Sequence, residues 1–189
     1  MGAVPVGQIV ARYAADVDLQ SCGSGNIGAT NVARVVGRRA GVVTLVADVA
    51  KGAVPVFASA WILNWGAFGW MCGVLAVLGH CYTPFLRWRG GKGVATSLGV
   101  LAVALPSVAL LTVLCWLAVV GVTRRSSLGA LVALPAVVVL TVWLSPGDVP
   151  WACTLAVLVL VRHTENIRRL LAGAEPSVSD SSVQEPAES

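Results

Sequence analysis

Long stretches of this chain are almost entirely apolar, and polar residues collect in a few short segments between them. The runs 40–62 and 69–88 each approach the about 20 residues that an α-helix needs to cross a lipid bilayer. Further apolar stretches lie at 94–122, 128–144 and 150–162. Because so many membrane-length runs do not fit one small core, the pattern predicts an all-α multi-pass membrane protein.

Composition favours the same fold class. Of the 189 residues, 57% are hydrophobic and 12% are charged, whereas soluble domains are about 45–50% apolar and about 25% charged. A chain with so few charged side chains has too little polar surface to cover a soluble fold. An unusually hydrophobic soluble helical domain is the less favoured alternative.

The basic residues predict how the chain threads the membrane. Short loops rich in Lys and Arg stay on the cytoplasmic side. The loops 64–70 and 145–150 contain neither residue, as expected for the opposite side. The clusters expected in the cytoplasm lie at 34–39, 87–92, 124–125 and 162–169.

The stretch 94–122 is compatible with one helix kinked at Pro106 or with two short crossings broken there. One crossing would place Arg124 and Arg125 outside, whereas two crossings return them to the cytoplasm. The cost is a first helix, 94–105, that rises only about 18 Å against a hydrocarbon core of about 30 Å. Such a helix needs protein neighbours. We therefore expect six crossings, plus or minus one, from residue 40 onward.

Neither end of the chain reads as a complete crossing. The N-terminal segment has about ten apolar residues before Arg12, roughly half a crossing, so that either the helix is short or the true start codon lies upstream. With it, the expected fold has about seven transmembrane helices. The segment 175–189 is rich in Ser, Pro and acidic residues and predicts a disordered tail after a single membrane domain at 1–174.

Metal, disulfide and cofactor chemistry have little support in the sequence. The five cysteines form no Cys-x-x-Cys pair, and the chain has only two histidines. We expect no metal and no cofactor, and no nucleic acid among the partners.

Two Gly-rich polar segments next to cations indicate anion binding. One is "CGSGNIGATNVAR" at 22–34, which ends in Arg34, and the other is "RWRGGKGVAT" at 87–96, which surrounds Lys92 with glycines. Glycines allow successive backbone N–H groups to converge on an anion, and a helix that follows adds its positive end. Neither segment has Walker A spacing, and "GSGNIG" lacks the preceding strand of a dinucleotide site. On one side of the membrane, the two predict a site for two phosphates or for one polyanion.

Charged and polar residues also follow or interrupt the apolar runs. In the segment 162–175, His163 and Asn166 share a helix face because they are three residues apart. An amphipathic helix at the lipid interface is the alternative reading of this segment. Asp48 and Lys51 stand inside an apolar run, where charges are costly unless paired, and we expect a structural ion pair.

Taken in order, "SGNIGATNVAR", "GGKGVAT" and "HTENIRRLLAGAE" resemble the motifs of the acyl-phosphate:glycerol-3-phosphate acyltransferase family (PlsY). The resemblance spans roughly residues 2–175 and includes "DVAKG" and "SSLGA". It implies a bacterial inner-membrane enzyme with seven helices and an active site facing the cytoplasm. The implied reaction moves a fatty acyl group from acyl phosphate to the 1-hydroxyl of sn-glycerol 3-phosphate and yields lysophosphatidate and phosphate. The implied partners are these substrates, the bilayer and the enzyme that produces acyl phosphate.

The resemblance also implies roles for individual residues, carried over motif by motif. Glu175 is expected to hold structure, as are Asp48 and Lys51. The implied catalytic residues are Ser24, Arg34, Lys92, His163 and Asn166. The implied phosphate-binding residues are Gly25, Asn26, Thr30, Asn31, Gly90, Gly91, Gly93 and Ser127.

Two questions stay open at the level of sequence. The proton of the attacking hydroxyl goes either to His163 or to a phosphate oxygen of the substrate, and direct transfer is favoured over a covalent acyl group on Ser24. The alternative functions are a catalytically degenerate paralogue that binds phosphorylated lipid or glycerol phosphate, and a small transporter of organic phosphate. A transporter predicts polar residues along helix interiors at the midplane, whereas here they gather in cytoplasmic loops.

Overall fold

The structure, a computed structural model, describes residues 1–63 and 66–180. All regular elements of these residues are helical. In chain order they are α1 (Val6–Ala15), α2 (Ala29–Val35), α3 (Arg38–Leu63), α4 (Ala67–Cys81), the 3-10 turn η1 (Pro84–Leu86), α5 (Val94–Ala104), α6 (Pro106–Thr123), α7 (Ser126–Leu144), the 3-10 turn η2 (Pro146–Asp148), α8 (Val149–Val161) and α9 (Thr164–Leu171).

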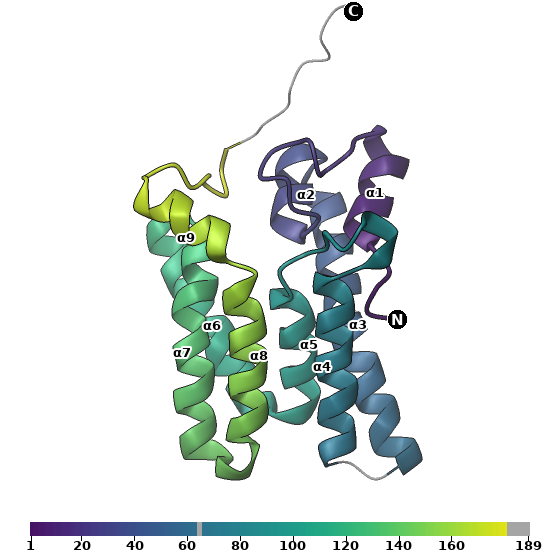
Figure 1. Ribbon diagram of the computed structural model, residues 1–189. Coiled ribbons are helices and arrows are strands. Elements are labelled where there is room, and N and C mark those ends of the chain that lie inside the picture. Colours follow the sequence, from purple (N-terminus) through teal and green to yellow (C-terminus); the bar gives the residue numbers. More distant parts are fainter. Residues whose placement is uncertain (64–65, 181–189) are drawn as a thin grey trace, which may run out of the picture.

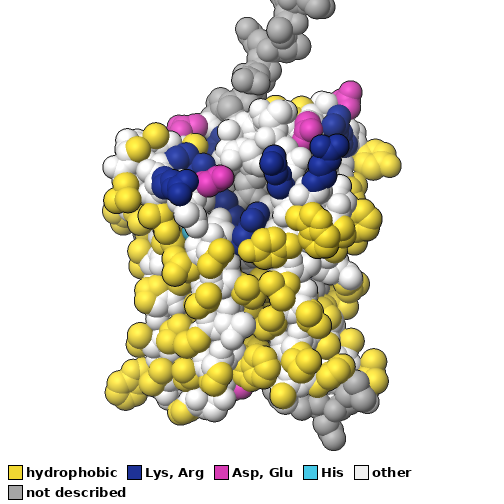
Figure 2. All heavy atoms as spheres, in the orientation of Figure 1, with side chains coloured by type: hydrophobic (Ala, Val, Ile, Leu, Met, Phe, Trp, Pro, Cys, Tyr) yellow, Lys and Arg dark blue, Asp and Glu magenta, His cyan; other side chains and the backbone are white. Residues whose placement is uncertain are grey.

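Helices α3 to α8 stand side by side, and the short helices α1, α2 and α9 lie together at one end of them (Figure 1). We call this the motif end, because α2, the segment 82–93 and α9 carry or adjoin the three sequence motifs. Hydrophobic side chains cover the sides of the molecule, whereas Lys and Arg side chains gather at the motif end (Figure 2). This distribution is that of a protein embedded in lipid with one basic face.

The expected crossings coincide in position with helices of the structure. Four segments are long and apolar enough to cross a membrane, while α5 and the segment Pro146–Val161 are apolar but shorter. The all-helical membrane fold predicted from the sequence is therefore found. The four long segments are Arg38–Ile62, Ala67–Leu86, Pro106–Thr123 and Ser126–Leu144.

The stretch around Pro106 forms two helices rather than one kinked helix. Leu105 leaves the helical conformation, with φ −139° and ψ 70°, and Pro106 then begins α6 at a position where its missing N–H is not needed. The end of α6 returns to the motif end, since the Arg124 carbonyl accepts a hydrogen bond from Val178 N–H at 2.8 Å. Helices α5 and α6 therefore run in opposite directions, as charge placement predicted (Figure 1).

The short helix α5 is held by close packing against α3. A Cβ added to Gly52 of α3 would lie 2.0 Å from the Thr96 carbonyl oxygen, and one added to Gly99 of α5 would lie 2.0 Å from that of Val49. Only glycine allows the two backbones to approach so closely. The protein neighbours that a short helix requires are thus supplied by α3.

The first residues of the acidic tail make contacts with the rest of the chain. These residues, 175–180, cross the motif end: Ser177 accepts a hydrogen bond from Arg34 through its carbonyl, and Val178 donates to the Arg124 carbonyl. Backbone groups of this segment thus find partners on α2 and after α6. The remaining tail, 181–189, lies outside the described residues, as do residues 64 and 65 of the expected loop 64–70.

Candidate active site

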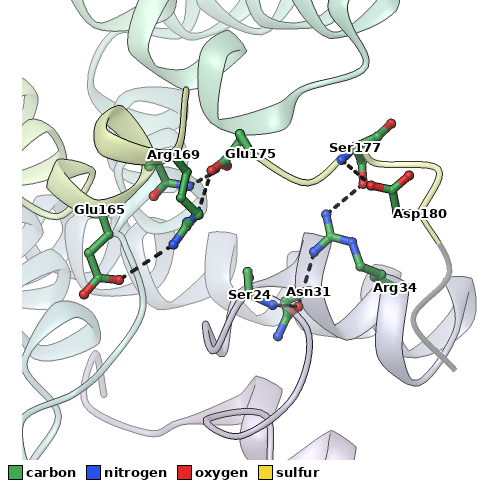
Figure 3. Close-up of polar contacts among 9 residues, drawn as sticks. Ser24, Asn31, Arg34, Glu165, Arg169, Glu175, Ser177 and Asp180 are labelled. Atoms are coloured by element: carbon green, nitrogen blue, oxygen red, sulfur yellow. Dashed lines mark hydrogen bonds and ion pairs between the residues drawn. The ribbon is translucent and has the colours of Figure 1, made fainter. Parts of the chain in front are cut away.

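The first motif folds around the side chain of Asn31, which is buried. Its amide nitrogen donates to the carbonyls of Cys22 at 3.1 Å and Asn26 at 2.8 Å. Its oxygen accepts from the backbone N–H of Ser24 at 2.9 Å and from Arg34 Nη1 at 3.3 Å (Figure 3). Asn31 therefore shapes the loop and orients Arg34, and its own amide is fully engaged in doing so.

Several backbone amides of the first loop donate within the loop. The N–H of Gly25 donates to the Cys22 carbonyl and that of Gly28 to the side chain of Asn26. Thr30 at the start of α2 contacts Ser126 of α7, with 3.3 Å between the two hydroxyl oxygens. In this conformation the amides of Gly25 and Gly28 are therefore engaged within the loop.

The glycine loop around Lys92 is built in a similar way. Gly90 N–H donates to the Cys81 carbonyl at 3.1 Å and Gly91 N–H to the His80 carbonyl at 3.0 Å. A Cβ on Gly91 would lie 2.0 Å from His80 Nε2, and Gly93 has φ 82°. These glycines therefore allow a tight loop over the end of α4, and the N–H groups of Gly90 and Gly91 are not free for a phosphate.

Lys92 is the cation that this loop presents. Its ammonium forms no hydrogen bond or ion pair with any residue in 1–63 or 66–180. Burial lowers the pKa of Lys92 to about 8, against the attraction of Glu175. At neutral pH the side chain is charged, partly desolvated and without a protein partner, as an anion-binding lysine requires.

His163 directly follows the end of α8 and is buried, with 2% of its surface exposed. Its Nδ1 lies 2.8 Å from the Val159 carbonyl oxygen, so Nδ1 carries the hydrogen and Nε2 has the lone pair. Burial lowers the pKa of His163 to about 4, and the nearby charge of Lys92 acts in the same direction, although the Val159 hydrogen bond opposes them. The imidazole is therefore neutral at pH 7.

Glu175 anchors α9 and the start of the tail. Asn166 Nδ2 donates to its Oε1 at 2.6 Å, and Arg169 Nε donates to its Oε2 at 2.8 Å (Figure 3). Burial acts to raise the pKa of Glu175, but the nearby Ser127 hydroxyl and the hydrogen bonds from Arg169 and Asn166 outweigh it and lower the pKa. Asn166 Oδ1 stays buried without a partner among the described residues, so it is an available acceptor.

Arg34 is held from two sides and faces a pocket. Besides the Asn31 contact, its Nη2 donates to the Ser177 carbonyl at 3.0 Å, and burial lowers its pKa against the attraction of Asp180 and Glu175. Its Nε is buried and makes no hydrogen bond within the described chain. The adjacent pocket has a volume of about 330 Å³ and is lined by Ala33, Arg34, Arg38, Arg124, Val178, Ser179 and Asp180.

The structure brings the three motifs to one place. Glu175 interacts electrostatically with Arg34, Lys92 and His163, which come from α2, the glycine loop and the end of α8. Arg34 and Lys92 carry positive charge, while the neutral His163 has a lone pair on Nε2. The arrangement fits reactions in which phosphate groups are bound and negative charge develops.

Asp48 and Lys51 lie apart from these groups, within α3. Lys51 Nζ is 2.6 Å from Asp48 Oδ1, and both side chains are buried. His80 Nδ1 lies 3.6 Å from the same carboxylate oxygen. The ion pair thus lies at the Nδ1 side of His80, whereas Nε2 of the same ring lies against Gly91 of the glycine loop.

A family model for glycerol-3-phosphate acyltransferase matches residues 1–173, more than nine-tenths of the chain. The chain belongs to the glycerol-3-phosphate acyltransferase family. A relative of that name from Pseudomonas savastanoi pv. phaseolicola is 42% identical over 93% of this chain and 91% of the relative. Another, from Geobacter sulfurreducens, is 43% identical over 93% of this chain and 91% of the relative.

Two solved structures of the family are also similar to this chain. Both are crystal structures of PlsY (YgiH), described as an integral membrane glycerol 3-phosphate acyltransferase. The glycerol 3-phosphate form is 36% identical with a TM-score of 0.88, and the lysophosphatidic acid form is 35% identical with a TM-score of 0.85. Each comparison covers 93% of this chain and 89% of the other.

Sequence reasoning missed three residues that support the site in this acyltransferase-family chain. Arg162 was counted only in a basic cluster, and Tyr82 and His80 were given no role. Arg162 in fact contacts the glycine loop, Tyr82 lies under its guanidinium, and His80 lies under Gly91. The adjacency of Arg162 to the motif residue His163 was the one signal in the sequence.

Proposed function

We propose that this protein transfers a fatty acyl group from acyl phosphate to the 1-hydroxyl of sn-glycerol 3-phosphate. The observation that carries the proposal is the grouping of Arg34, Lys92 and neutral His163 at the motif end, each within the electrostatic reach of Glu175. It is supported by the similarity to PlsY structures described as glycerol 3-phosphate and lysophosphatidic acid forms. The products are lysophosphatidate and inorganic phosphate.

The two cations fit the charges of this reaction. Glycerol 3-phosphate carries a phosphate, and the donor releases one, so negative charge must be countered on both reactants. Among the residues that the structure describes, the charged amine of Lys92 and the Nε of Arg34 have no hydrogen-bond partner. Preorganised cations of this kind stabilise developing charge without reorganising during the reaction. We assign Lys92 and Arg34 to the phosphates, with the hydroxyls of Ser24 and Ser127 as additional donors.

The proton balance favours a substrate phosphate as the base. The 1-hydroxyl oxygen bonds to the acyl carbon, the bond from that carbon to the phosphate oxygen breaks, and the hydroxyl proton must be accepted. A phosphate monoester has a second pKa of about 6, whereas the pKa of His163 is lowered to about 4. The phosphate is thus the stronger base and accepts the hydroxyl proton, so the neutral His163 is not the base in this step.

Direct transfer needs no covalent intermediate. The Ser24 hydroxyl has no hydrogen bond to a base among residues 1–63 and 66–180, and acyl phosphate is already an activated donor. An activated serine nucleophile requires an adjacent base. Ser24 therefore binds substrate, and Asn166, held by Glu175, offers its free Oδ1 as an acceptor at the same site.

The proposed setting is the bacterial inner membrane with the motif end in the cytoplasm. We assign six crossings to α3 through α8, and α1 is the partial seventh helix at the motif end. The grouping of Lys and Arg at that end supports this orientation. The donor comes from an enzyme that makes acyl phosphate, and its acyl chain lies beside the short α5, where it is open to lipid.

The experiment is to purify the protein in detergent and follow phosphate release from palmitoyl phosphate with and without glycerol 3-phosphate. We expect acceptor-dependent phosphate release and formation of lysophosphatidate, and no product when palmitoyl coenzyme A replaces the donor. Lys92→Ala is expected to abolish turnover or to raise the KM for glycerol 3-phosphate. Folded protein that binds glycerol 3-phosphate without acceptor-dependent release would instead be the non-catalytic paralogue.

A further inference from the structure

Arg162, the residue that follows α8, is engaged on three sides by the protein. Its Nε donates to the Gly91 carbonyl at 3.1 Å, and its Nη2 donates to the Gly90 carbonyl at 3.0 Å. Its guanidinium carbon lies 5.1 Å from the centroid of the Tyr82 ring, within the range of a cation–π contact. A cation needed only for membrane orientation would not require these contacts.

The same two glycines are also held by the end of α4. The N–H groups of Gly90 and Gly91 donate to the carbonyls of Cys81 and His80. Both the donors and the acceptors of these two glycines are therefore fixed, the donors by α4 and the acceptors by Arg162. Little freedom is left to the next residue, Lys92.

Arg162 also precedes His163, whose imidazole is fixed by the Val159 carbonyl. The hydrogen bonds from Arg162 thus join the loop residue before Lys92 to the residue before His163. We propose that Arg162, stacked on Tyr82, is a positioning residue that sets the Lys92 ammonium against the His163 imidazole. This inference rests on the proposed function, because it concerns residues assigned to the same reaction.

The side-chain chemistry explains why lysine would not replace this arginine. A guanidinium is planar, donates along two directions at once and stacks on an aromatic ring. An ammonium is a flexible point charge that does not span two successive carbonyls while stacking. Arg162→Lys therefore keeps the charge and removes what we call the clamp, namely the two hydrogen bonds to the glycine loop and the stacking on Tyr82. The Tyr82 hydroxyl makes no hydrogen bond within the described chain, so Tyr82→Phe keeps the whole interaction.

The first test is activity in a matched set of variants. We expect Arg162→Lys and Tyr82→Leu to lower kcat/KM for glycerol 3-phosphate at least tenfold, and Tyr82→Phe to stay within twofold of wild type. Arg168→Lys is the control, because Arg168 is an exposed arginine on α9 whose side chain has no partner in the described residues. If Arg162→Lys behaves like Arg168→Lys, or if Tyr82→Phe fails like Tyr82→Leu, the clamp is overturned.

The second test measures the protonation of Lys92 and does not depend on catalytic activity. The chain has two lysines, Lys51 and Lys92, and Lys51 is buried in an ion pair. Lys92 is acetylated with acetic anhydride at a series of pH values, and the extent of acetylation is measured by mass spectrometry. In wild type we expect the extent to reach half of its maximum near pH 8. In Arg162→Lys, whose charge is kept, we expect this midpoint to move up by at least half a pH unit (about threefold in proton affinity) as the loop loosens.

The two tests separate the two possible failures. If wild type releases no acceptor-dependent phosphate while Lys92 labelling shifts as expected, the proposed function fails and the clamp stands. If Arg162→Lys loses activity while the labelling of Lys92 does not change, Arg162 acts directly on substrate and the positioning role is overturned.

Discussion

At the scale of single residues, Lys92 has the charge whose titration should be visible in activity. Burial lowers its pKa to about 8, so the free enzyme loses this cation as the pH rises through that value. We expect kcat/KM for glycerol 3-phosphate to fall above about pH 8, since kcat/KM reports the free enzyme. Arginine does not titrate in this range. In Lys92→Arg we therefore expect no fall of kcat/KM above pH 8, even if the variant is slower than wild type. An unchanged fall in that variant would assign the titration to another group.

Glu175 and Glu165 interact with the same arginine, so substitutions of the two can be compared directly. Both contact Arg169, but Glu175 is nearly buried with a hydrogen bond of 2.8 Å, whereas Glu165 is 82% exposed with its nearest oxygen at 3.9 Å. Glu175→Gln is expected to destabilise the protein by about 1–3 kcal/mol, because it disrupts charged, buried hydrogen bonds. Glu165→Gln should cost less than about 0.5 kcal/mol.

Thermal unfolding followed by tryptophan fluorescence in detergent checks this prediction, and its pH dependence supplies a control. The folded pKa of Glu175 is lowered, so its charge stabilises the fold above the ordinary glutamate pKa of about 4.3. That contribution is lost as the pH falls through the folded pKa. The difference in stability between wild type and Glu175→Gln should therefore shrink at low pH. Equal destabilisation by Glu175→Gln and Glu165→Gln would contradict the assignment of Glu175 as the anchor.

At the scale of elements, most helices follow from local sequence. The expected crossing at 40–62 corresponds to α3 at Arg38–Leu63, and the break at Pro106 separates α5 from α6. The length of an apolar run, a proline and a cluster of charges act locally, so the helices that depend on them can be predicted from the sequence. The clamp was not readable, because Arg162 bonds residues 71 and 72 positions away. The engagement of the Gly90 and Gly91 amides likewise depends on the end of α4, which glycine content alone does not reveal.

The close approach of α3 and α5 makes a prediction at this scale. A Cβ on Gly99 would lie 2.0 Å from the Val49 carbonyl oxygen, whereas one on Gly121 in α6 meets nothing within 4 Å. Gly99→Ala must separate the two helices, and overpacking of this kind costs about 1–3 kcal/mol. Gly121→Ala should be neutral or slightly stabilising, since alanine favours helix. Thermal unfolding of both variants tests this prediction. Equal unfolding midpoints for Gly99→Ala and Gly121→Ala would show that α5 is not held by this contact.

At the scale of the whole molecule, aromatic side chains mark the depth of the membrane. Trp61 and Trp143 are 80% and 81% exposed near the ends of α3 and α7, and Trp88 is 65% exposed at the motif end. Tryptophan is enriched at both membrane interfaces. The 23 helical steps from Arg38 to Trp61 rise about 35 Å, slightly more than a hydrocarbon core of about 30 Å. The motif end and the opposite end therefore lie at different surfaces of the bilayer.

The proposed orientation rests on the placement of charge and can be tested by labelling. Gly147, in the turn before α8, is exposed and has open space around it, and Ala172 is exposed at the end of α9. In a variant without native cysteines, Gly147→Cys should react with a membrane-impermeant maleimide in intact spheroplasts, while Ala172→Cys should react only after permeabilisation. The positive-inside bias predicts this pattern because Lys and Arg gather at the motif end. The reverse pattern would place the site outside, where cytoplasmic acyl phosphate does not reach it, and labelling of both from outside would contradict the odd number of crossings that separates them.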